Sequence, residues 1–212
     1  MITVKQLAKV AGAVCVTLGV LLTGATAWAE TPHDVVRGVT TKLMAEVEEN
    51  RQFLETEPDK FYSAVGDVLE PVVDFKFIAM SVMGPYSKKA APEQKDQFVE
   101  VFKGGLINTY AKGMAGFGDL DIVVLPPEGD ITGQRRVSVV QEVRGDDGGV
   151  NRISYTMGKN RQGEWKLINV VLNGINLGKT FRSQFMQAMK KQGDLNQVIT
   201  EWAAEDDTVA AN

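Results

Sequence analysis

The spacing of hydrophobic residues changes twice along the chain. In residues 31–115, apolar side chains recur every three or four positions, which is the spacing of one face of an α-helix. From Asp119 to Leu172 they recur mostly every second position, as in strands with one buried face. The helical interval returns at Leu177. Helices, then strands, then helices favour the α+β class.

The first part divides into four predicted helices, because residues that typically begin or end helices recur in it. These signals are, in order, Thr31-Pro32, Pro58 with Pro71, Asp74 with Gly84, and Ala91-Pro92. The helix after Asp74 is apolar on nearly all sides, so it must be covered on nearly all sides. Two further helices are predicted at the end of the chain, over 177–191 and 194–203.

Turns rich in glycine and proline separate four predicted strands, which would form an antiparallel meander. The strands are centred on 122–124, 137–143, 153–157 and 165–172. The last strand is apolar on both faces, so protein or ligand must cover both of its sides. We predict a curved four-stranded sheet with helices packed on its concave face, enclosing an apolar cavity.

The N-terminus has the pattern of a cleaved signal peptide. Lys5 and Lys9 precede the apolar run 10–23, and Ala27-Trp28-Ala29 places small residues before a cleavage site. Residues 1–29 are therefore expected to be removed, which makes the mature protein exported and soluble. Residues 30–204 are long enough for a single domain, and the acidic tail 205–212 is expected to be disordered.

Charge and cysteine content exclude several classes of function. The chain has 23 basic and 27 acidic residues, a net charge of -4, which argues against a nucleic-acid partner. Cys15 is the only cysteine and lies in the signal peptide, so the mature chain has no disulfide, thiolate metal site or catalytic cysteine.

Residues for enzymatic chemistry are scarce. The only histidine, His33, lies near the mature N-terminus, where we expect a surface position rather than a catalytic base. Asp146-Asp147 lies in a glycine-rich turn and has too few partners for a metal site. We expect no catalytic residue, no metal and no cofactor.

Two groups of motifs resemble a known family. The first is Trp165-Lys166, then Gly174-Ile175-Asn176-Leu177, then Phe181-Arg182-Ser183-Gln184-Phe185. The second is Val73-Asp74-Phe75, then Met83-Gly84 with Tyr86, then Ala91-Pro92-Glu93-Gln94 with aromatic residues at helical spacing up to Tyr110. Both are similar to the MlaC family of periplasmic phospholipid-binding proteins, which are also toluene-tolerance auxiliary proteins of a lipid ABC transporter. Three positions depart from the family pattern: Asn169 replaces Asp, Asn176 replaces Ser and Phe181 replaces Tyr.

The resemblance implies a periplasmic carrier in a Gram-negative envelope, with no covalent chemistry. It would hold the acyl chains of glycerophospholipids and maintain outer-membrane lipid asymmetry. Its implied partners are an outer-membrane lipoprotein complex and an inner-membrane ABC transporter complex with an MCE-domain protein, and we expect a monomer. The side chains expected to line the tail cavity are apolar or aromatic: Phe75, Ile78, Val82, Phe102, Leu106, Tyr110, Val139, Tyr155, Leu167, Val170 and Leu172.

Other interpretations remain open from sequence alone. A periplasmic holdase for lipidated or apolar polypeptides would have the same signal peptide and the same apolar interior. An enzyme on this scaffold would have to use Asp74 or Tyr110. Arg135 and Arg136, at the start of a strand, are either contacts for a lipid phosphate or ordinary strand-edge charges.

Overall fold

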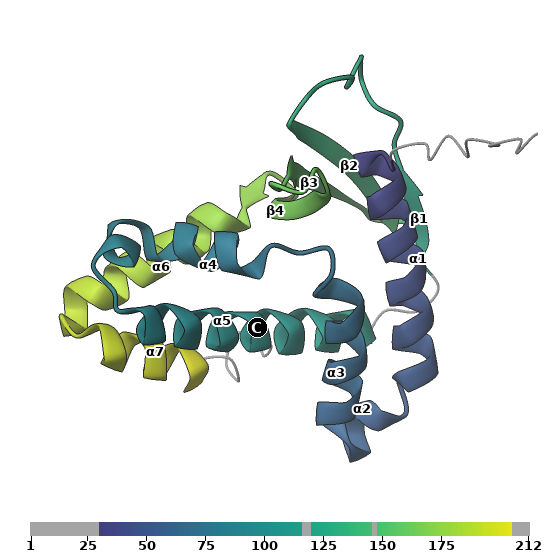
Figure 1. Ribbon diagram of the computed structural model, residues 1–212. Helices are drawn as coiled ribbons and strands as arrows, with labels where there is room; N and C mark the ends of the chain where they lie inside the picture. Colours follow the sequence, from purple (N-terminus) through teal and green to yellow (C-terminus); the bar gives the residue numbers. More distant parts are fainter. Residues whose placement is uncertain (1–29, 116–119, 146–147, 205–212) are drawn as a thin grey trace, which may run out of the picture.

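The computed structural model describes residues 30–115, 120–145 and 148–204 (Figure 1). The signal peptide, Cys15, the Asp146-Asp147 turn and the tail 205–212 lie outside these ranges. The helices are α1 (Pro32–Asn50), α2 (Phe53–Thr56), α3 (Pro58–Leu69), α4 (Phe75–Met83), the 3-10 helix η1 (Gly84–Lys88), α5 (Pro92–Ala115), α6 (Leu177–Gln192) and α7 (Leu195–Ala204). The strands are β1 (Asp121–Val124), β2 (Arg136–Arg144), β3 (Val150–Lys159), β4 (Trp165–Leu172) and β5 (Ile175–Asn176). Within these ranges, no helix is both long enough and apolar enough to cross a membrane.

The sheet is an antiparallel meander in the order β1-β2-β3-β4-β5. The sequence predicted its first four strands and missed β5. This short strand forms because Asn173 and Gly174 both adopt positive φ (48° and 84°), which turns the chain back onto β4. The Asn173 side chain fixes the turn, since its Oδ1 accepts a hydrogen bond from the backbone N–H of Arg152 (2.9 Å).

Helix α1 packs against one face of the sheet. It begins with the predicted cap at Thr31, whose side chain and that of Asp34 bond reciprocally to each other's backbone N–H groups. The sheet cluster lies where α1 meets β2 and β3, and its buried members are Val35, Val36, Val137, Val139 and Met157. We name this covered side the inner face of the sheet.

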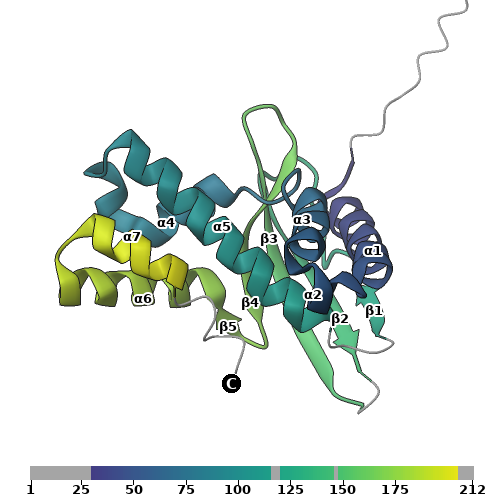
Figure 2. The same ribbon diagram turned by 90° about the horizontal axis from the view of Figure 1, so that it is seen from below.

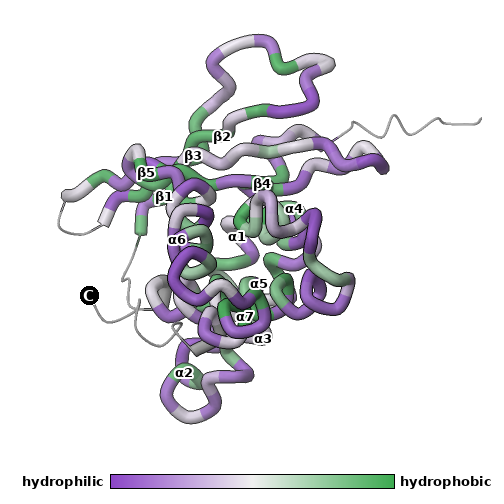
Figure 3. The backbone as a smooth tube through the Cα atoms, turned by 90° about the vertical axis from the view of Figure 1, so that its left-hand side faces the viewer, coloured by the Kyte–Doolittle hydropathy of each residue, from purple (hydrophilic) through white to green (hydrophobic). Residues whose placement is uncertain are grey.

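The remaining helices form two further clusters. Figure 2 shows α5 crossing the molecule, with α6 and α7 on one side of it and α1 and α3 on the other. The helical cluster comprises Ala79, Val82, Met83, Ala90, Phe98, Phe102, Phe185, Met189, Val198 and Ile199. The α1–α3 cluster comprises Val47, Phe61, Val65, Phe75, Ile107 and Ala111. Figure 3 shows hydrophobic segments gathered in the middle of the molecule.

Gly84 occupies a backbone conformation that a larger residue adopts only under strain. It ends α4 with φ 56° and ψ -124°, and a Cβ there would lie 3.0 Å from the Arg182 guanidinium. We expect Gly84→Ala to lower the free energy of unfolding by about 1–3 kcal/mol in urea titrations. Gly104, in open space on α5, is the control, since Gly104→Ala should raise it by up to about 1 kcal/mol. Equal effects of the two substitutions would contradict the assigned strain.

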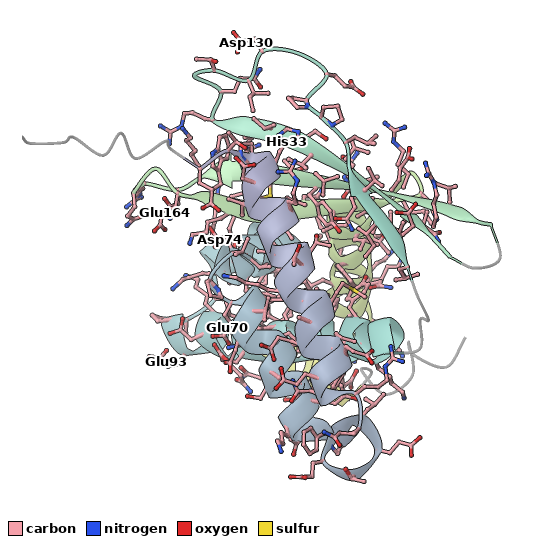
Figure 4. All side chains as sticks on the ribbon, turned by 90° about the vertical axis from the view of Figure 1, so that its right-hand side faces the viewer. His33, Glu70, Asp74, Glu93, Asp130 and Glu164 are labelled. Atoms are coloured by element: carbon pink, nitrogen blue, oxygen red, sulfur yellow. The ribbon has the colours of Figure 1, made fainter. Side chains whose placement is uncertain are left out.

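The prediction that His33 lies on the surface is wrong. Its side chain is 5% exposed at the end of α1 that meets the sheet (Figure 4), and its Nδ1 has no hydrogen-bond partner among the described residues. The first turn of α1 does not fray, because its capping box and the sheet cluster hold it in place. Burial, and to a lesser degree the Arg37 charge, lower the pKa of His33, while Asp34 opposes the shift.

This lowered pKa gives His33 a predictable effect on stability. Below about pH 6.5 the unfolded chain binds a proton at this histidine more readily than the folded chain does, so acidification favours unfolding. We expect the midpoint of urea unfolding to fall between pH 7 and pH 5, and His33→Gln to reduce that fall. An unchanged pH dependence in His33→Gln would exclude His33 as its source.

Candidate functional site

The strand register places several predicted site residues on the inner face of the sheet. Val139 pairs with Tyr155, and Tyr155 pairs with Val170, so the three side chains lie abreast on neighbouring strands. Val139 is fully buried in the sheet cluster, which identifies this side as the one that faces α1. The row therefore extends the inner face from β2 to β4.

A β-bulge determines which residues of β4 join this face. Thr156 pairs with Asn169 and Met157 with Leu167, so Ile168 is an extra residue without a partner on β3. The extra residue shifts the alternation of side chains along β4 by one position. Leu167, Val170 and Leu172 therefore share the inner face. Simple alternation would have separated Leu167 from the other two.

The inner face is covered unevenly. Val139 and Met157, beneath α1, are fully buried. Tyr155 is only half-buried, and so is every residue of β4, including Val170 and Leu172. The helices therefore leave the β3–β4 part of an apolar surface incompletely covered.

The helical residues predicted to line a cavity lie in different environments. Val82 and Phe102 are 1% exposed within the helical cluster, while Phe75 is buried in the α1–α3 cluster. Ile78 is half-buried against the helical cluster, and Leu106 contacts both helical groups. Tyr110 is 38% exposed on α5.

The eleven predicted residues thus do not belong to one packed core. A domain of this size usually has one contiguous core, whereas here three clusters of buried residues are separate. The half-buried members Ile78, Leu106, Tyr155 and Leu167 pack at the edges of these clusters. Val170 and Leu172 are half-buried and belong to none of the three. Such an arrangement leaves apolar surface that a ligand of hydrocarbon can cover.

The titratable groups near this surface are unsuited to acid–base catalysis. Burial raises the pKa of Tyr155 to about 12, and it also raises the pKa of Tyr110, so both phenols stay neutral. Asp74 is engaged as the N-cap of α4, where its Oδ1 accepts from the backbone N–H of Phe77 (2.9 Å). The described residues contain no group of three His, Cys, Asp or Glu side chains that could hold a metal ion.

Two pockets lie around the turn between β3 and β4, and polar residues line most of each. One, of about 420 Å³, is bordered by Glu30, Val35, Pro71, Lys159, Gln162, Gly163, Glu164, Trp165 and Lys166. The other, of about 470 Å³, is bordered by Asp74, Phe77, Arg135, Arg136, Gly158, Lys159, Asn160, Arg161, Gln162, Lys166 and Ile168. None of the eleven predicted tail-lining residues borders either pocket.

Comparison with known proteins identifies the fold and the family. The family model described as MlaC protein matches residues 37–204. The chain belongs to the MlaC family. It is 42% identical over 179 residues to toluene tolerance protein ttg2D of Pseudomonas putida, a match that covers 84% of this chain and 82% of that protein. It is 23% identical to the intermembrane phospholipid transport system binding protein MlaC of Haemophilus influenzae, over 83% of each chain.

A solved structure of another protein has the same architecture. The phospholipid-binding protein of Ralstonia solanacearum, solved in complex with a phospholipid, superposes with a TM-score of 0.75 at 23% identity. The match covers 84% of this chain and 98% of that one. The predicted family and the predicted α+β class are both confirmed, with five strands in place of four.

The three departures from the MlaC signature have structural roles. Asn176 caps α6, since its Oδ1 accepts from the backbone N–H of Lys179 (3.0 Å), as a serine can. The Phe181 ring packs edge-on against Phe102, with centroids 5.5 Å apart. The Asn169 Oδ1 lies so close to Gly178 that a Cβ there would be 2.5 Å away, so these two residues set how closely α6 approaches β4.

Proposed function

We propose that this protein is a periplasmic phospholipid carrier that holds acyl chains against the inner face of its sheet. The observation that carries the proposal is the half-buried apolar surface of β3 and β4, on the side of the sheet that the helices cover. Membership of the MlaC family and the phospholipid complex of the Ralstonia solanacearum protein support it.

The need for a carrier follows from the energetics of hydrocarbon in water. A phospholipid has some 30 methylenes, and at about 0.8 kcal/mol each their exposure would cost on the order of 20 kcal/mol. A protein with an apolar interior removes this cost, so that transfer to and from a bilayer is nearly balanced. The helical cluster includes Met83 and Met189, whose flexible side chains adapt to ligands of different shape.

The predicted tail-lining residues divide by accessibility. Seven of them can contact a ligand as they stand, because they are half-buried or exposed: Ile78, Leu106, Tyr110, Tyr155, Leu167, Val170 and Leu172. Val82, Phe102 and Val139 are fully packed, so they would contact a tail only when the clusters separate. Opening between clusters is therefore part of the proposed mechanism, and no covalent step belongs to it.

The partners and location are proposed on the same grounds. The Haemophilus influenzae relative is named as the binding protein of an intermembrane phospholipid transport system. We infer that this chain shuttles glycerophospholipids between an outer-membrane lipoprotein complex and an inner-membrane MCE-domain ABC transporter complex, after its signal peptide is cleaved.

Native mass spectrometry of the purified protein tests this function. We expect protein ions that carry an added mass of one or more glycerophospholipids, released as phospholipids on collisional activation. Protein without lipid that instead protects an acylated lipoprotein from aggregation would overturn the proposal in favour of a holdase. Turnover of a lipid ester by the purified protein would overturn it in favour of an enzyme.

A further inference from the structure

The larger pocket at the β3–β4 turn concentrates positive charge on an acidic protein. Its border includes five cationic side chains, namely Arg135, Arg136, Lys159, Arg161 and Lys166. The whole chain has a net charge of -4. A local excess of this kind, against the sign of the whole molecule, marks a surface that attracts anions. We name it the basic pocket.

Most of these cations are not neutralised within the protein. Among the described residues, the ion pairs include Lys166 with Glu164 (3.1 Å) but none to Arg135, Arg136 or Arg161. Asp74 is the one carboxylate on the border of the pocket as described, and Glu164 pairs with Lys166 beside it; both lie on the same side of the molecule (Figure 4). Five cations against two carboxylates leave a clear positive excess.

Both carboxylates also accept hydrogen bonds from groups that are not among the five cations. Asp74 caps α4, and Glu164 accepts hydrogen bonds from Asn160 as well as pairing with Lys166. Asn160 holds the turn itself, because its Oδ1 accepts from the backbone N–H groups of Gln162 and Glu164. Arg161 therefore projects from a defined turn, and Lys159 and Lys166 lie on the strands that this turn joins.

The pocket lies on the opposite side of the sheet from the proposed tail surface. Arg136 pairs with Gly158, and Gly158 pairs with Lys166. Side chains alternate between the two faces along a strand, and these three positions fall on the face opposite to that of Val139 and Tyr155. The bulged Ile168 covers Gly158, since a Cβ on that glycine would lie 2.9 Å from its Cδ1. Contacts here are thus separate from those that would hold acyl chains.

An exposed aromatic ring borders the same pocket. Phe77, at the start of α4, is 41% exposed, one of the largest exposures among the big apolar side chains of the described residues. With Ile168 it adds apolar surface among long basic side chains. Basic side chains around an exposed aromatic ring are typical of surfaces that bind the interface of an anionic membrane.

We propose that the basic pocket docks the protein onto an anionic phospholipid bilayer. The arginines would bind lipid phosphates, for which a planar guanidinium offers paired donors, while Phe77 enters the headgroup region. A bilayer fits better than a single anion, because its phosphates recur across the surface and satisfy several separated cations at once. This inference goes beyond the carrier function and does not depend on bound lipid.

Vesicle co-sedimentation tests the proposal directly. The wild-type protein should bind vesicles of phosphatidylglycerol and phosphatidylcholine in equal parts at low salt, and pure phosphatidylcholine vesicles much more weakly. Salt at about 1 M should abolish the difference between the two vesicle types, since it shortens the Debye screening length to about 3 Å. Equal binding to both vesicle types, or no binding to either, would overturn the proposal; the second result would leave an acidic protein surface as the partner.

Charge reversal assigns the binding to this pocket. Each basic side chain near an anionic surface contributes about fivefold to binding, so Arg136→Glu with Arg161→Glu should weaken it by at least about 25-fold. The matched control, Lys42→Glu with Lys112→Glu, makes the same charge change at exposed sites on α1 and α5 and should retain most of the binding. Equal losses in the two double variants would overturn the proposal.

The outcome is distinguishable from failure of the carrier function. The phospholipid detected by native mass spectrometry should be the same in Arg136→Glu with Arg161→Glu as in the wild type, because the pocket and the inner face lie on opposite sides of the sheet. A protein that purifies without lipid yet binds anionic vesicles through the basic pocket would contradict the carrier function and support the docking surface.

Discussion

Val170→Asp should remove most of the phospholipid that purifies with the protein. Val170 lies between Tyr155 and the edge of the sheet on the inner face, and it is half-buried. A carboxylate against an acyl chain costs about 2.5–3.5 kcal/mol when the site is fully apolar. Allowing for partial exposure, we expect at least about a tenfold loss of bound lipid per folded protein.

The control for this substitution is its neighbour on the same strand. Val171 pairs with Ser154, is also half-buried and points to the opposite face. Val171→Asp introduces the same charge and should leave the lipid content within about twofold, although it too costs some stability. Native mass spectrometry after selection of folded protein by gel filtration measures both. Equal losses from both substitutions would show that the inner face has no special role.

Phe98→Ala should destabilise the fold strongly, and by more than Gly84→Ala does. The Phe98 ring is fully buried and packs against the rings of Phe102, Phe185 and Trp202, with centroids 5.0–5.7 Å apart. Its removal leaves a cavity that these rigid rings cannot fill, so we expect a loss of about 3–5 kcal/mol in the free energy of unfolding. That is a large fraction of the roughly 5–15 kcal/mol typical of a domain.

The exposed ring of Phe77 provides the comparison for Phe98. Phe77→Ala removes the same atoms from a half-exposed site and should cost no more than about 1 kcal/mol in urea titrations. A similar loss in both variants would mean that the aromatic packing of the helical cluster does not dominate its stability.

Local signals predicted the helices well because the caps of a helix are encoded within a few residues. Thr31 and Asp74 cap α1 and α4 as expected, and Gly84 ends α4. The turn before β5 also had a local signal, since Asn173-Gly174 is a typical two-residue hairpin turn, but Ile175–Asn176 is too short for a pattern of apolar residues to indicate a strand. Short strands at sheet edges are set by turns rather than by their own residues.

The inner face could be predicted only in part. Val139, Tyr155 and three residues of β4 are predicted from sequence to line the tail cavity, and the register places all five on one face. Alternation alone could not place Leu167 beside Val170, because the bulge at Ile168 changes the parity within the strand. The extra residue is detected only through pairing with β3. A bulge of this kind therefore has no signal in the strand that contains it.

The basic pocket and the burial of His33 could not be predicted from the sequence, for a related reason. Arg135 and Arg136 stood out as adjacent charges, but Arg161 and Lys166 join them only because the β3–β4 turn lies beside the start of β2. His33 is buried because α1 packs on strands that lie a hundred residues later in the chain. Both are consequences of tertiary packing.

Site-specific photo-crosslinking tests the central claim most directly. A benzophenone amino acid would replace Leu106 on the helical side, Leu172 on the sheet side and, as the control, Val150, which is 52% exposed and lies on the opposite face of the sheet. The account predicts that irradiation of the purified protein adds the mass of a phospholipid at Leu106 and at Leu172 but not at Val150. Lipid adducts at Val150 alone, or none at either inner position, would contradict it.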